Sequence, residues 1–392
     1  MSSASDSQPG GDCPLSVLIA CGGTGGHLYP GIAVAQELLR AGHRCTLLIS
    51  EKKIDALAAS AHPELRFEVL PALRMPRVWS WRMLPFLRSL WRQYRLCLEM
   101  IRRDKVSVVL GMGGFTSLMP LRAGRRAGCR TLIHESNAIM GKANRLNARY
   151  ADEVLCGMQA CVSRLAGKRS ARLVGTPLRR SMHEPVNRAQ AAEFFHLDAN
   201  KKTLLVVGGS QGAQAINLMI ARALPLFEAL GWQLLHVCGP ADYAEVRKLY
   251  AAHPALPQHV CAFCHRMELA YAMADVALAR SGASTLAELA HFSLPSVLVP
   301  YPHAAEDHQT RNAEVFADAG AAVLLPQEQI NAELLGEYLS KWNAQPQELQ
   351  RMRQAAGSLA QRDCAAVVAG IILELAAGAS QSRGSSQTPA CR

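Results

Sequence analysis

One local pattern occurs twice in this chain: a short apolar strand, a glycine-rich turn and then a helix. Ser16–Cys21 runs into Gly22–Gly26, and Thr203–Val207 runs into Gly208–Gly212. After each opening, further short apolar runs alternate with longer helical patterns. Strands that alternate with helices in this way predict parallel sheets covered by helices. Two such series predict an α/β chain with two doubly wound parallel-sheet domains.

The expected strands are 16–21, 46–50, 106–110, 131–134 and 153–156, and then 203–207, 233–237, 259–262, 276–279, 296–299 and 322–325. The clearest expected helices are 31–41, 86–101, 213–229 and 285–291. Gly and Pro punctuate the junction at 175–177. We therefore expect a first domain over 14–177 and a second over 178–359, with a helix at 360–378 that can pack back on the first. The polar ends, 1–13 and 379–392, are expected to be disordered.

Composition excludes several classes of protein. The chain has 392 residues, 49% apolar and 19% charged, so it can bury the cores of two or three domains and is not disordered. It has no run of about 18 apolar residues and no signal peptide, so we expect neither a transmembrane helix nor export. A cytoplasmic location with mostly reduced cysteines follows from that expectation.

Charge is distributed unevenly along the chain. Residues 1–178 hold 25 basic and 12 acidic side chains, and residues 179–392 hold 17 and 19, so the net charge of +11 divides into +13 and −2. This asymmetry indicates an anionic partner: nucleic acid, an anionic membrane or a phosphorylated substrate. An Arg-rich genome is the simpler alternative, since 33 of the 42 basic residues are Arg, but it would not explain the asymmetry.

Three glycine loops directly follow apolar strands: 22–26, 111–114 and 208–212. Glycine lets the backbone approach a ligand closely, and free N–H groups at a helix start favour phosphate, so we expect a phosphate or diphosphate site. The GxxxxGK[ST] pattern of a P-loop NTPase is absent. The first loop reads GGTGG rather than GxGxxG, and its acidic candidate is Glu51, so NAD is a weak alternative.

A fourth loop, 281–288, follows the strand 276–279 and offers hydroxyl and N–H groups at a helix start. Glu288, one turn into that helix, has the position to accept hydrogen bonds from the two hydroxyls of a ribose. Thr285 and Glu288 also match a capping box, in which they would stabilise the helix end instead. The sequence leaves both interpretations open.

The most basic segment is also aromatic. Residues 74–103 contain eight Arg, one acidic residue and three of the five Trp, namely Trp79, Trp81 and Trp91. Apolar residues recur at helical spacing over 86–101, so this helix can lie in a lipid interface or cover a core with its Arg-rich face in solvent. For the stretch around Trp79 and Trp81, contact with a membrane is the favoured interpretation. Nucleic acid lacks a recognisable motif here.

Signals for a metal or a haem are weak. Cys261–His265 reads CAFCH, the attachment pattern of haem c, but covalent haem of this kind needs an exported protein. A zinc site would need a second ligand pair at suitable spacing, and no DxD motif is present to hold a metal against a diphosphate. We therefore expect neither a metal nor a cofactor.

His27 and Asn137 are candidate ligand contacts because each follows the carboxyl end of an expected strand, where ligands bind in parallel sheets. His27 comes directly after the first glycine loop, and an ordinary histidine pKa of about 6.5 suits proton abstraction near neutral pH. A histidine at a helix start can also be only a cap.

Seven stretches together resemble the MurG family of bacterial glycosyltransferases, which is glycosyltransferase family 28 and has the GT-B architecture. They are GGTGGHLYPGIAVA (22–35), GMGGFTSLMP (111–120), HESNAIMGKANR (134–145), VGTPLR (174–179), VVGGSQGAQAIN (206–217), RSGASTLAEL (280–289) and PYPHAAEDHQTRNA (300–313). They span about residues 17–320 in the family's order. The resemblance implies two Rossmann-like domains facing a central cleft, with UDP-N-acetylglucosamine mainly on the second domain and the acceptor, lipid I, on the first.

The resemblance also implies site residues, with Glu288 on the ribose, the Ser210 loop on the phosphates, and Asn137 with Gln309 on the sugar. The full set for the nucleotide sugar is Thr24, Gly25, Gly26, Asn137, Arg179, Ser210, Cys264, Ala283, Ser284, Thr285, Leu286, Ala287, Glu288, His308 and Gln309. On the acceptor and membrane side we expect Gly113, Gly114, Arg77, Trp79, Trp81, Arg82, Arg88 and Trp91. Some members carry two glutamines where this chain has His308 and Gln309, so either of these two can contact the sugar.

The implied reaction is a single displacement with inversion, in which the C4 hydroxyl of the muramoyl-pentapeptide of lipid I attacks the anomeric carbon and UDP leaves. Lipid II, a precursor of peptidoglycan, is the product. His27 is the candidate general base, and helix N-termini take the diphosphate charge, so no metal is required. The implied place is the cytoplasmic face of the inner membrane, peripherally bound, with an anionic lipid surface and proteins of cell-wall synthesis or division as partners, and no nucleic acid.

Four rival interpretations remain at this stage. Two are enzymes of the same architecture, a glycolipid glycosyltransferase and a UDP-sugar epimerase. The third is an NAD-dependent oxidoreductase, and the fourth is a membrane-surface binding module without catalysis.

Overall fold

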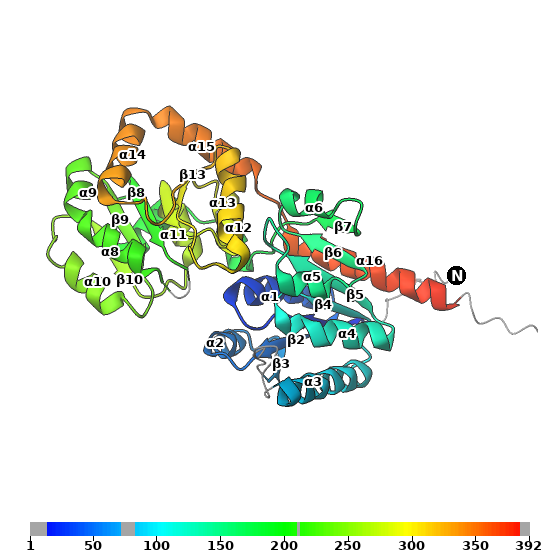
Figure 1. Ribbon diagram of the computed structural model, residues 1–392. Helices are drawn as coiled ribbons and strands as arrows, with labels where there is room; N and C mark the ends of the chain where they lie inside the picture. Colours follow the sequence, from blue (N-terminus) through cyan, green and yellow to red (C-terminus); the bar gives the residue numbers. More distant parts are fainter. Residues whose placement is uncertain (1–13, 72–82, 210–211, 385–392) are drawn as a thin grey trace, which may run out of the picture.

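The computed structural model describes residues 14–71, 83–209 and 212–384, without the side chains of 53–54 and 379–384. Within these ranges the chain forms two lobes, each built on one parallel sheet (Figure 1). The first lobe is the basic part of the sequence and the second is the nearly neutral part.

The first sheet has the strand order β3-β2-β1-β4-β5-β6-β7. Its strands are β1 (Ser16–Ala20), β2 (Arg44–Ser50), β3 (Arg66–Leu70), β4 (Val108–Gly111), β5 (Arg130–Glu135), β6 (Glu153–Cys156) and β7 (Ala171–Leu173). The elements around it are α1 (Gly25–Arg40), α2 (Lys53–Ala61), α3 (Met83–Arg103), η1 (Phe115–Ser117), α4 (Leu118–Ala127), α5 (Lys142–Asn147) and α6 (Gln159–Leu165). Strands β1 and β4 are buried along their whole length, as expected for apolar strands covered on both faces.

The second sheet has the order β10-β9-β8-β11-β12-β13. Its strands are β8 (Thr203–Val207), β9 (Gln233–Val237), β10 (Gln258–Cys261), β11 (Val276–Ala279), β12 (Ser296–Leu298) and β13 (Ala322–Leu324). The helices of this part are η2 (Arg180–His183), α7 (Arg188–Phe195), α8 (Gln214–Arg222), α9 (Leu224–Leu230), α10 (Tyr243–Tyr250), α11 (Met267–Met273), α12 (Ala283–His291), η3 (Ala305–Asp307), α13 (His308–Asp318), α14 (Ala332–Ala344) and α15 (Pro346–Ser358).

Each sheet has one point at which the strand order reverses, between β1 and β4 in the first and between β8 and β11 in the second. In open parallel sheets, ligands bind outside the carboxyl ends of the strands at such a point. The loops at 22–26 and 111–114 leave β1 and β4, the loop at 281–288 leaves β11, and the described glycines of the loop after β8 are Gly208, Gly209 and Gly212. The four loops singled out in the sequence therefore lie at the two switch points.

The last helix, α16 (Cys364–Gly384), packs against the first lobe although it follows the second in the chain (Figure 1). Its Val368 and Ile372 are fully buried in one cluster with Leu28 and Ile32 of α1. We propose on this basis the division into 14–177 with 360–378, and 178–359. The helix continues to Gly384, beyond the expected end at 378, and the terminal segments 1–13 and 385–392 lie outside the described residues.

Several expected elements differ from the observed ones. Helix α1 begins at Gly25 rather than 31 and contains Pro30. The expected helix 213–229 is divided into α8 and α9 at Ala223, just before Pro225, which has no N–H to continue the ladder. Strands β3 and β7 were not expected; they form the two edges of the first sheet and are only partly buried, so their apolar signal is weak.

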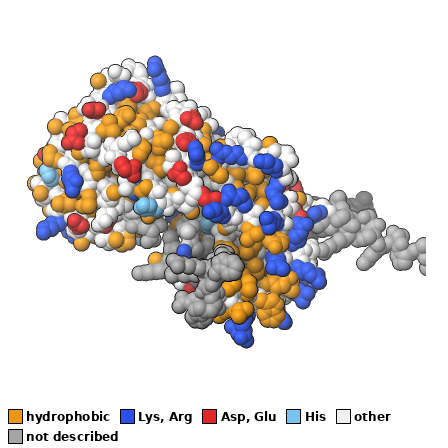
Figure 2. Space-filling view, viewed as in Figure 1, with side chains coloured by type: hydrophobic (Ala, Val, Ile, Leu, Met, Phe, Trp, Pro, Cys, Tyr) orange, Lys and Arg blue, Asp and Glu red, His pale blue; other side chains and the backbone are white. Residues whose placement is uncertain are grey.

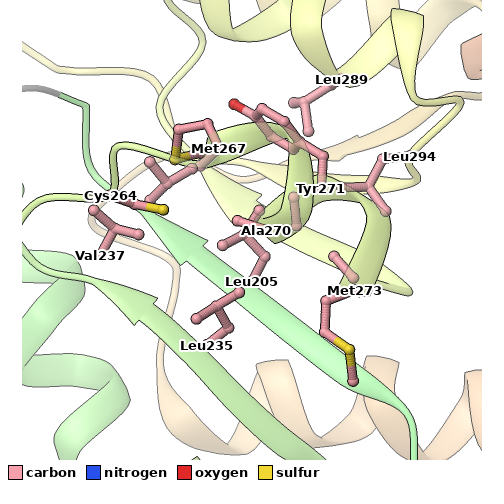
Figure 3. Close-up of a cluster of buried hydrophobic side chains, with 14 of the residues drawn as sticks. Leu205, Leu235, Val237, Cys264, Met267, Ala270, Tyr271, Met273, Leu289 and Leu294 are labelled. Atoms are coloured by element: carbon pink, nitrogen blue, oxygen red, sulfur yellow. The ribbon is translucent and has the colours of Figure 1, made fainter. Parts of the chain in front are cut away.

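The second lobe has buried clusters on both faces of its sheet. In Figure 3, Leu205 and Leu235 lie along the strands of one cluster, while Cys264 and Met267 lie near the carboxyl ends of the strands. The hydroxyl of Tyr271 points out of that cluster. This end of the cluster forms the floor of the cavity described next.

Candidate functional site

A cavity of about 170 Å³ lies between the two lobes, at the carboxyl ends of both sheets. From the first lobe it is lined by Gly25, Gly26, Tyr29 and Pro30. From the second lobe and the connection into it, the lining includes Arg179, Gly209, Phe263, Cys264, Tyr271, Ser284, Thr285 and Glu288. Seven residues expected in the nucleotide-sugar site are therefore brought together here: Gly25, Gly26, Arg179, Cys264, Ser284, Thr285 and Glu288.

Helix α12 begins at the cavity with an uncapped N-terminus. Its N-cap is Gly282, and among the described residues no side chain caps the first turn. The capping-box interpretation of Thr285 and Glu288 is therefore wrong, because Thr285 lies inside the helix and not at its N-cap. An uncapped helix start presents N–H groups and a partial positive charge, which suits a phosphate oxygen.

Glu288 is held in the cavity by a tyrosine. The Tyr271 hydroxyl donates to Oε2 of Glu288 at 2.6 Å. Burial raises the pKa of Glu288, while the charge of Arg179 and the Tyr271 hydrogen bond oppose this rise. Tyr271 was not among the expected site residues, and its place in the sequence, inside an apolar helix, gave no signal of a polar role.

Arg179 spans the junction of the lobes. Its guanidinium lies over the ring of Tyr29, 4.7 Å from the ring centroid, and thereby contacts helix α1 of the first lobe. Its Nε is buried and has no hydrogen-bond partner among the described residues. An unpartnered buried donor in a cavity is available to a polar ligand.

The thiol of Cys264 also lines the cavity, and burial raises its pKa. Both cysteines of the CAFCH pattern, Cys261 and Cys264, are free thiols. Within the described ranges, no group of three or more His, Cys, Asp or Glu side chains is arranged to hold a metal ion.

His27 lies in the first turn of α1, directly after the cavity residue Gly26. Its Nδ1 is 3.3 Å from the hydroxyl of Thr24. A Cβ placed on Gly113 would lie 2.8 Å from Nε2 of His27, so only glycine leaves room for the imidazole here. Gly114 lies against the same ring. The structure thus brings Thr24, His27, Gly113 and Gly114 together at the first switch point.

The imidazole of His27 is neutral at pH 7. Burial lowers the pKa of His27 to about 4, and the charge of His308 from the second lobe also lowers it. An unprotonated imidazole is the form that a general base requires. The contact of His308 with the sugar stays a prediction.

Asn137 is tied to both lobes. Its Nδ2 donates to Oε1 of Glu135 at 2.8 Å, and its Oδ1 accepts from Nδ2 of Asn312 in α13 at 3.0 Å. Asn312 is fully buried, and it also accepts from the N–H of Ala138 and donates to the carbonyl of Ser281. Asn312 thereby joins the Asn137 loop to the start of α12, a function that its position in the sequence did not indicate.

Other expected residues do not line the cavity. The Oε1 of Gln309 accepts from the backbone N–H of Tyr301 at 3.0 Å, and Nδ1 of His308 is 2.6 Å from the carbonyl of Ala305. Leu286 is fully buried in the core of the second lobe. Ala283 and Ala287 line a separate cavity of about 40 Å³ at the junction of the lobes. Ser210 lies outside the described residues.

A second contact joins the lobes next to the cleft. Glu306 of η3 forms an ion pair with Arg145 of α5, and its Oε2 accepts from the backbone N–H of Lys142 at 2.8 Å. Burial raises the pKa of Glu306, but the hydrogen bonds from Arg145 and Lys142 outweigh it and leave that pKa below its ordinary value of 4.5. Glu306 and Asp307 both have positive φ, so this loop is constrained where it reaches the other lobe.

Helix α3 carries an apolar surface away from the cleft. Leu84, Leu87 and Trp91 are 76%, 52% and 58% exposed. Arg88 is exposed beside them, and the guanidinium of Arg95 lies 5.1 Å from the ring centroid of Trp91. Figure 2 shows apolar side chains gathered on this part of the first lobe, with Lys and Arg side chains around them. Arg77, Trp79, Trp81 and Arg82 lie outside the described residues.

No helix in the described part of the chain has the length and apolar character to cross a membrane. We call Leu84, Leu87, Arg88 and Trp91 the α3 surface.

Known proteins resemble this chain along nearly its whole length. Its residues 17–156 match the glycosyltransferase family 28 N-terminal domain, and residues 203–368 match the glycosyltransferase family 28 C-terminal domain. A protein of Shewanella denitrificans named UDP-N-acetylglucosamine--N-acetylmuramyl-(pentapeptide) pyrophosphoryl-undecaprenol N-acetylglucosamine transferase is 38% identical over 363 residues, which is 92% of this chain and 97% of the relative. A protein of the same name from Streptomyces coelicolor is 33% identical over 92% of this chain and 98% of its own length.

Solved structures show the same architecture. The crystal structure of Acinetobacter baumannii MurG superposes with a TM-score of 0.71 at 27% identity, and it covers 92% of this chain and all of the other. CalG4, the calicheamicin glycosyltransferase, shares the fold with a TM-score of 0.63 at 16% identity, over 93% of this chain and 98% of its own. Both sheets of this chain are parallel and face a common cleft, as in the GT-B class. On this evidence the chain belongs to glycosyltransferase family 28, within the MurG family of N-acetylglucosamine transferases.

Proposed function

We propose that this chain transfers N-acetylglucosamine from UDP-N-acetylglucosamine to the C4 hydroxyl of the muramoyl-pentapeptide of lipid I, which forms lipid II for peptidoglycan synthesis. The observation that carries this proposal is the cavity at the two switch points. It unites Glu288, Arg179 and the uncapped start of α12 with the His27 helix. Relatives that bear the name of this activity match over 92% of the chain.

The second lobe and the connection into it hold the nucleotide in this proposal. The carboxylate of Glu288 accepts from the ribose hydroxyls, and Tyr271 keeps that carboxylate in place. The N-terminus of α12 and the loop at Ser210 take the diphosphate charge. The buried Nε of Arg179 supplies a further donor in the same cavity. Charge that develops on the leaving UDP is stabilised where these donors are already oriented.

The first lobe supplies the base. The acceptor hydroxyl attacks the anomeric carbon, the bond from that carbon to the diphosphate oxygen breaks, and the proton of the hydroxyl passes to Nε2 of His27. UDP leaves with the bonding electron pair. The lowered pKa keeps His27 unprotonated before the reaction begins. Asn137, which is hydrogen-bonded to Asn312 of the second lobe, and either His308 or Gln309 contact the sugar in this proposal.

The α3 surface is our candidate for the membrane contact of the first lobe. Exposed Leu84, Leu87 and Trp91 can enter the interface, while Arg88 faces anionic headgroups. This places the acceptor side of the enzyme at the membrane that carries lipid I, at its cytoplasmic face in our proposal. Proteins of cell-wall synthesis or division stay a prediction for further partners.

The test of the activity is transfer with radiolabelled UDP-N-acetylglucosamine and a lipid I analogue. We expect labelled disaccharide product and one UDP released for each sugar transferred. A membrane-binding module without catalysis would release no UDP. If labelled sugar reached other glycolipids but not the lipid I analogue, the proposed acceptor would be wrong.

Nucleotide binding separates the proposal from an oxidoreductase. UDP is expected to raise the melting temperature, since a ligand that binds only the folded state stabilises it. NAD is expected to leave the melting temperature unchanged. Stabilisation by NAD and none by UDP would reverse this assignment.

A further inference from the structure

We propose that Lys52 and Asp55, at the start of α2, form a clamp on the Gly23 peptide that positions His27, and that the charge of Asp55 stabilises His27 once it has taken a proton. The inference rests on the proposed role of His27 as the base. We call Lys52 and Asp55 the Gly23 clamp.

The clamp holds both polar groups of one residue. Oδ2 of Asp55 accepts from the N–H of Gly23 at 2.9 Å, and Nζ of Lys52 donates to the carbonyl of Gly23 at 2.6 Å. The same Oδ2 accepts from the N–H and the hydroxyl of Ser50 at 2.8 and 2.6 Å, so the loop is fastened to the end of β2. Asp55 is fully buried. Gly23 has a φ of +110°, a conformation that glycine adopts readily, and these bonds hold its peptide in that orientation.

The position of Gly23 determines that of His27 through Thr24. The carbonyl of Thr24 accepts from the N–H of His27 at 3.1 Å and from that of Leu28 at 3.0 Å. The hydroxyl of Thr24 contacts Nδ1 of His27, which leaves Nε2 at Gly113. A rotation of the Gly23 peptide would therefore turn the whole start of α1. A displacement of about 1 Å at a reacting group is enough to cost about 100-fold in rate.

The charges around His27 give Asp55 a second effect. The groups that act on His27 are His134, Lys52 and His308, which oppose its protonation, and Asp55, which favours it. Asp55 is the one acidic member of this set in the described structure. Its Oδ1 is buried without a hydrogen-bond partner among the described residues. A carboxylate in this state is weakly screened, and its field favours the imidazolium that forms as the acceptor hydroxyl loses its proton.

The experiment uses the full chain with Asp55→Asn, which keeps an oxygen for Gly23 but removes the charge. We expect kcat with the lipid I analogue to fall about 10- to 100-fold, with the Kd for UDP unchanged within about twofold. In NMR of histidine-labelled protein, the titration of His27 should move to lower pH, since the group that raises the pKa of His27 is lost. Asp318→Asn, an exposed change at the end of α13, is the matched control and should alter neither value.

Two further variants separate position from charge. Asp55→Glu keeps the charge and should recover part of the lost kcat. Lys52→Met removes one half of the clamp and a positive charge, so it should lower kcat while moving the His27 titration to higher pH. If Asp55→Asn does not fold, as judged by circular dichroism, these two variants carry the test.

An unchanged kcat in Asp55→Asn, or a loss of UDP affinity as large as the loss of kcat, would overturn the inference. Failure of the proposed function has a different signature, because the wild-type chain would then not glycosylate the lipid I analogue. The His27 titration would still report whether Asp55 acts on the imidazole.

Discussion

The two sides of the cleft hold their glycine loops in different ways. In loop 22–26 of the first lobe, the N–H of Gly22 donates to the carbonyl of Leu48 and that of Gly23 to Asp55. On the second lobe, the N-cap of α12 is Gly282, and no side chain of the described residues caps its first turn. In the first loop, the N–H groups of Gly22 and Gly23 form hydrogen bonds within the lobe and fix the shape of the loop. At the start of α12, the N–H groups of the first turn stay available to an anion. The difference fits the proposed functions of the two sides, in which the first lobe positions a base and the second lobe binds a diphosphate.

The net charge of the first lobe and the charge buried beneath its glycine loop have opposite signs. The first lobe carries the excess of basic residues, yet the buried group beneath its glycine loop is the carboxylate of Asp55. The exposed cations lie elsewhere, on helices such as α3 (Figure 2). Net charge therefore describes the outer surface and its partners, not the chemistry inside the cleft.

The largest expected effect comes from removing the base. His27→Ala should lower turnover about 10²- to 10⁴-fold, which is the usual contribution of a general base, and leave binding of UDP-N-acetylglucosamine intact. Calorimetry of donor binding beside the transfer assay measures both. His253→Ala, a histidine between α10 and β10, is the control. Normal turnover in His27→Ala would show that His27 is not the base. It would then contradict the proposal that the first lobe supplies the base while the second binds the nucleotide.

The corresponding substitution on the second lobe is Glu288→Ala. We expect the Kd of UDP to rise about 10- to 150-fold, since a hydrogen bond to a charged group contributes about 1.5–3 kcal/mol. Tyr271→Phe keeps the carboxylate and removes only its support, so its effect on the Kd should be smaller. The NMR titration of His27 should be the same in both variants. Equal affinity for UDP in Glu288→Ala would mean that the ribose is held elsewhere.

A smaller effect is expected at the membrane. Replacing Arg77, Arg82 and Arg88 with Glu should weaken sedimentation with anionic vesicles, by about 1 kcal/mol for each positive charge lost, and leave the affinity for UDP unchanged. Arg88→Glu alone tests the described part of this surface, with Arg222→Glu on α8 as the control. Unaltered vesicle binding would require another explanation for the charge asymmetry of the chain.

The smallest effect is expected where the lobes touch. Glu306→Gln removes the ion pair with Arg145, and exposed pairs of this kind contribute about 0–1 kcal/mol, so fluorescence transfer between labelled lobes should report only a slight opening. The pKa of Glu306 lies below 4.5, so the contribution is present above that pH and is lost as the pH falls through the lowered pKa. Glu314→Gln breaks a pair with Arg311 inside α13 and should not open the cleft. Full opening of the cleft at neutral pH would show that Glu306 contributes more than an exposed ion pair does.

Much of the fold was visible in the sequence because short-range patterns specify it. The strands 153–156, 203–207, 233–237 and 276–279 were expected at their observed bounds, since buried parallel strands are short apolar runs. The edge strands β3 and β7 were missed because they are only partly buried, which leaves their apolar pattern weak. Helix α1 was expected to begin at 31, whereas it begins at Gly25 and contains Pro30 within its first two turns.

The residues of the candidate site likewise fall into two groups, those with a local sequence signal and those without one. Glycine loops, His27 and Glu288 carry local signals, because a tight turn or a helix start needs particular residue types at fixed spacing. Tyr271, Asn312 and the Gly23 clamp carry none, because each acts on a partner brought close by the fold: Asn312 reaches Asn137 across 175 positions of the chain. Leu286 shows the converse, since a residue inside a site motif faces the core.

The sequence by itself determined that this chain has two parallel-sheet lobes, that its glycine loops end strands, and that its basic residues gather in the first part. Those properties depend on neighbours within a few residues, whose geometry the backbone fixes. Only the tertiary structure decided which N–H groups stay open to an anion and which are taken by Asp55 or by a neighbouring carbonyl. That choice depends on groups from separate strands and helices, and these meet only when the two switch points close on one cleft.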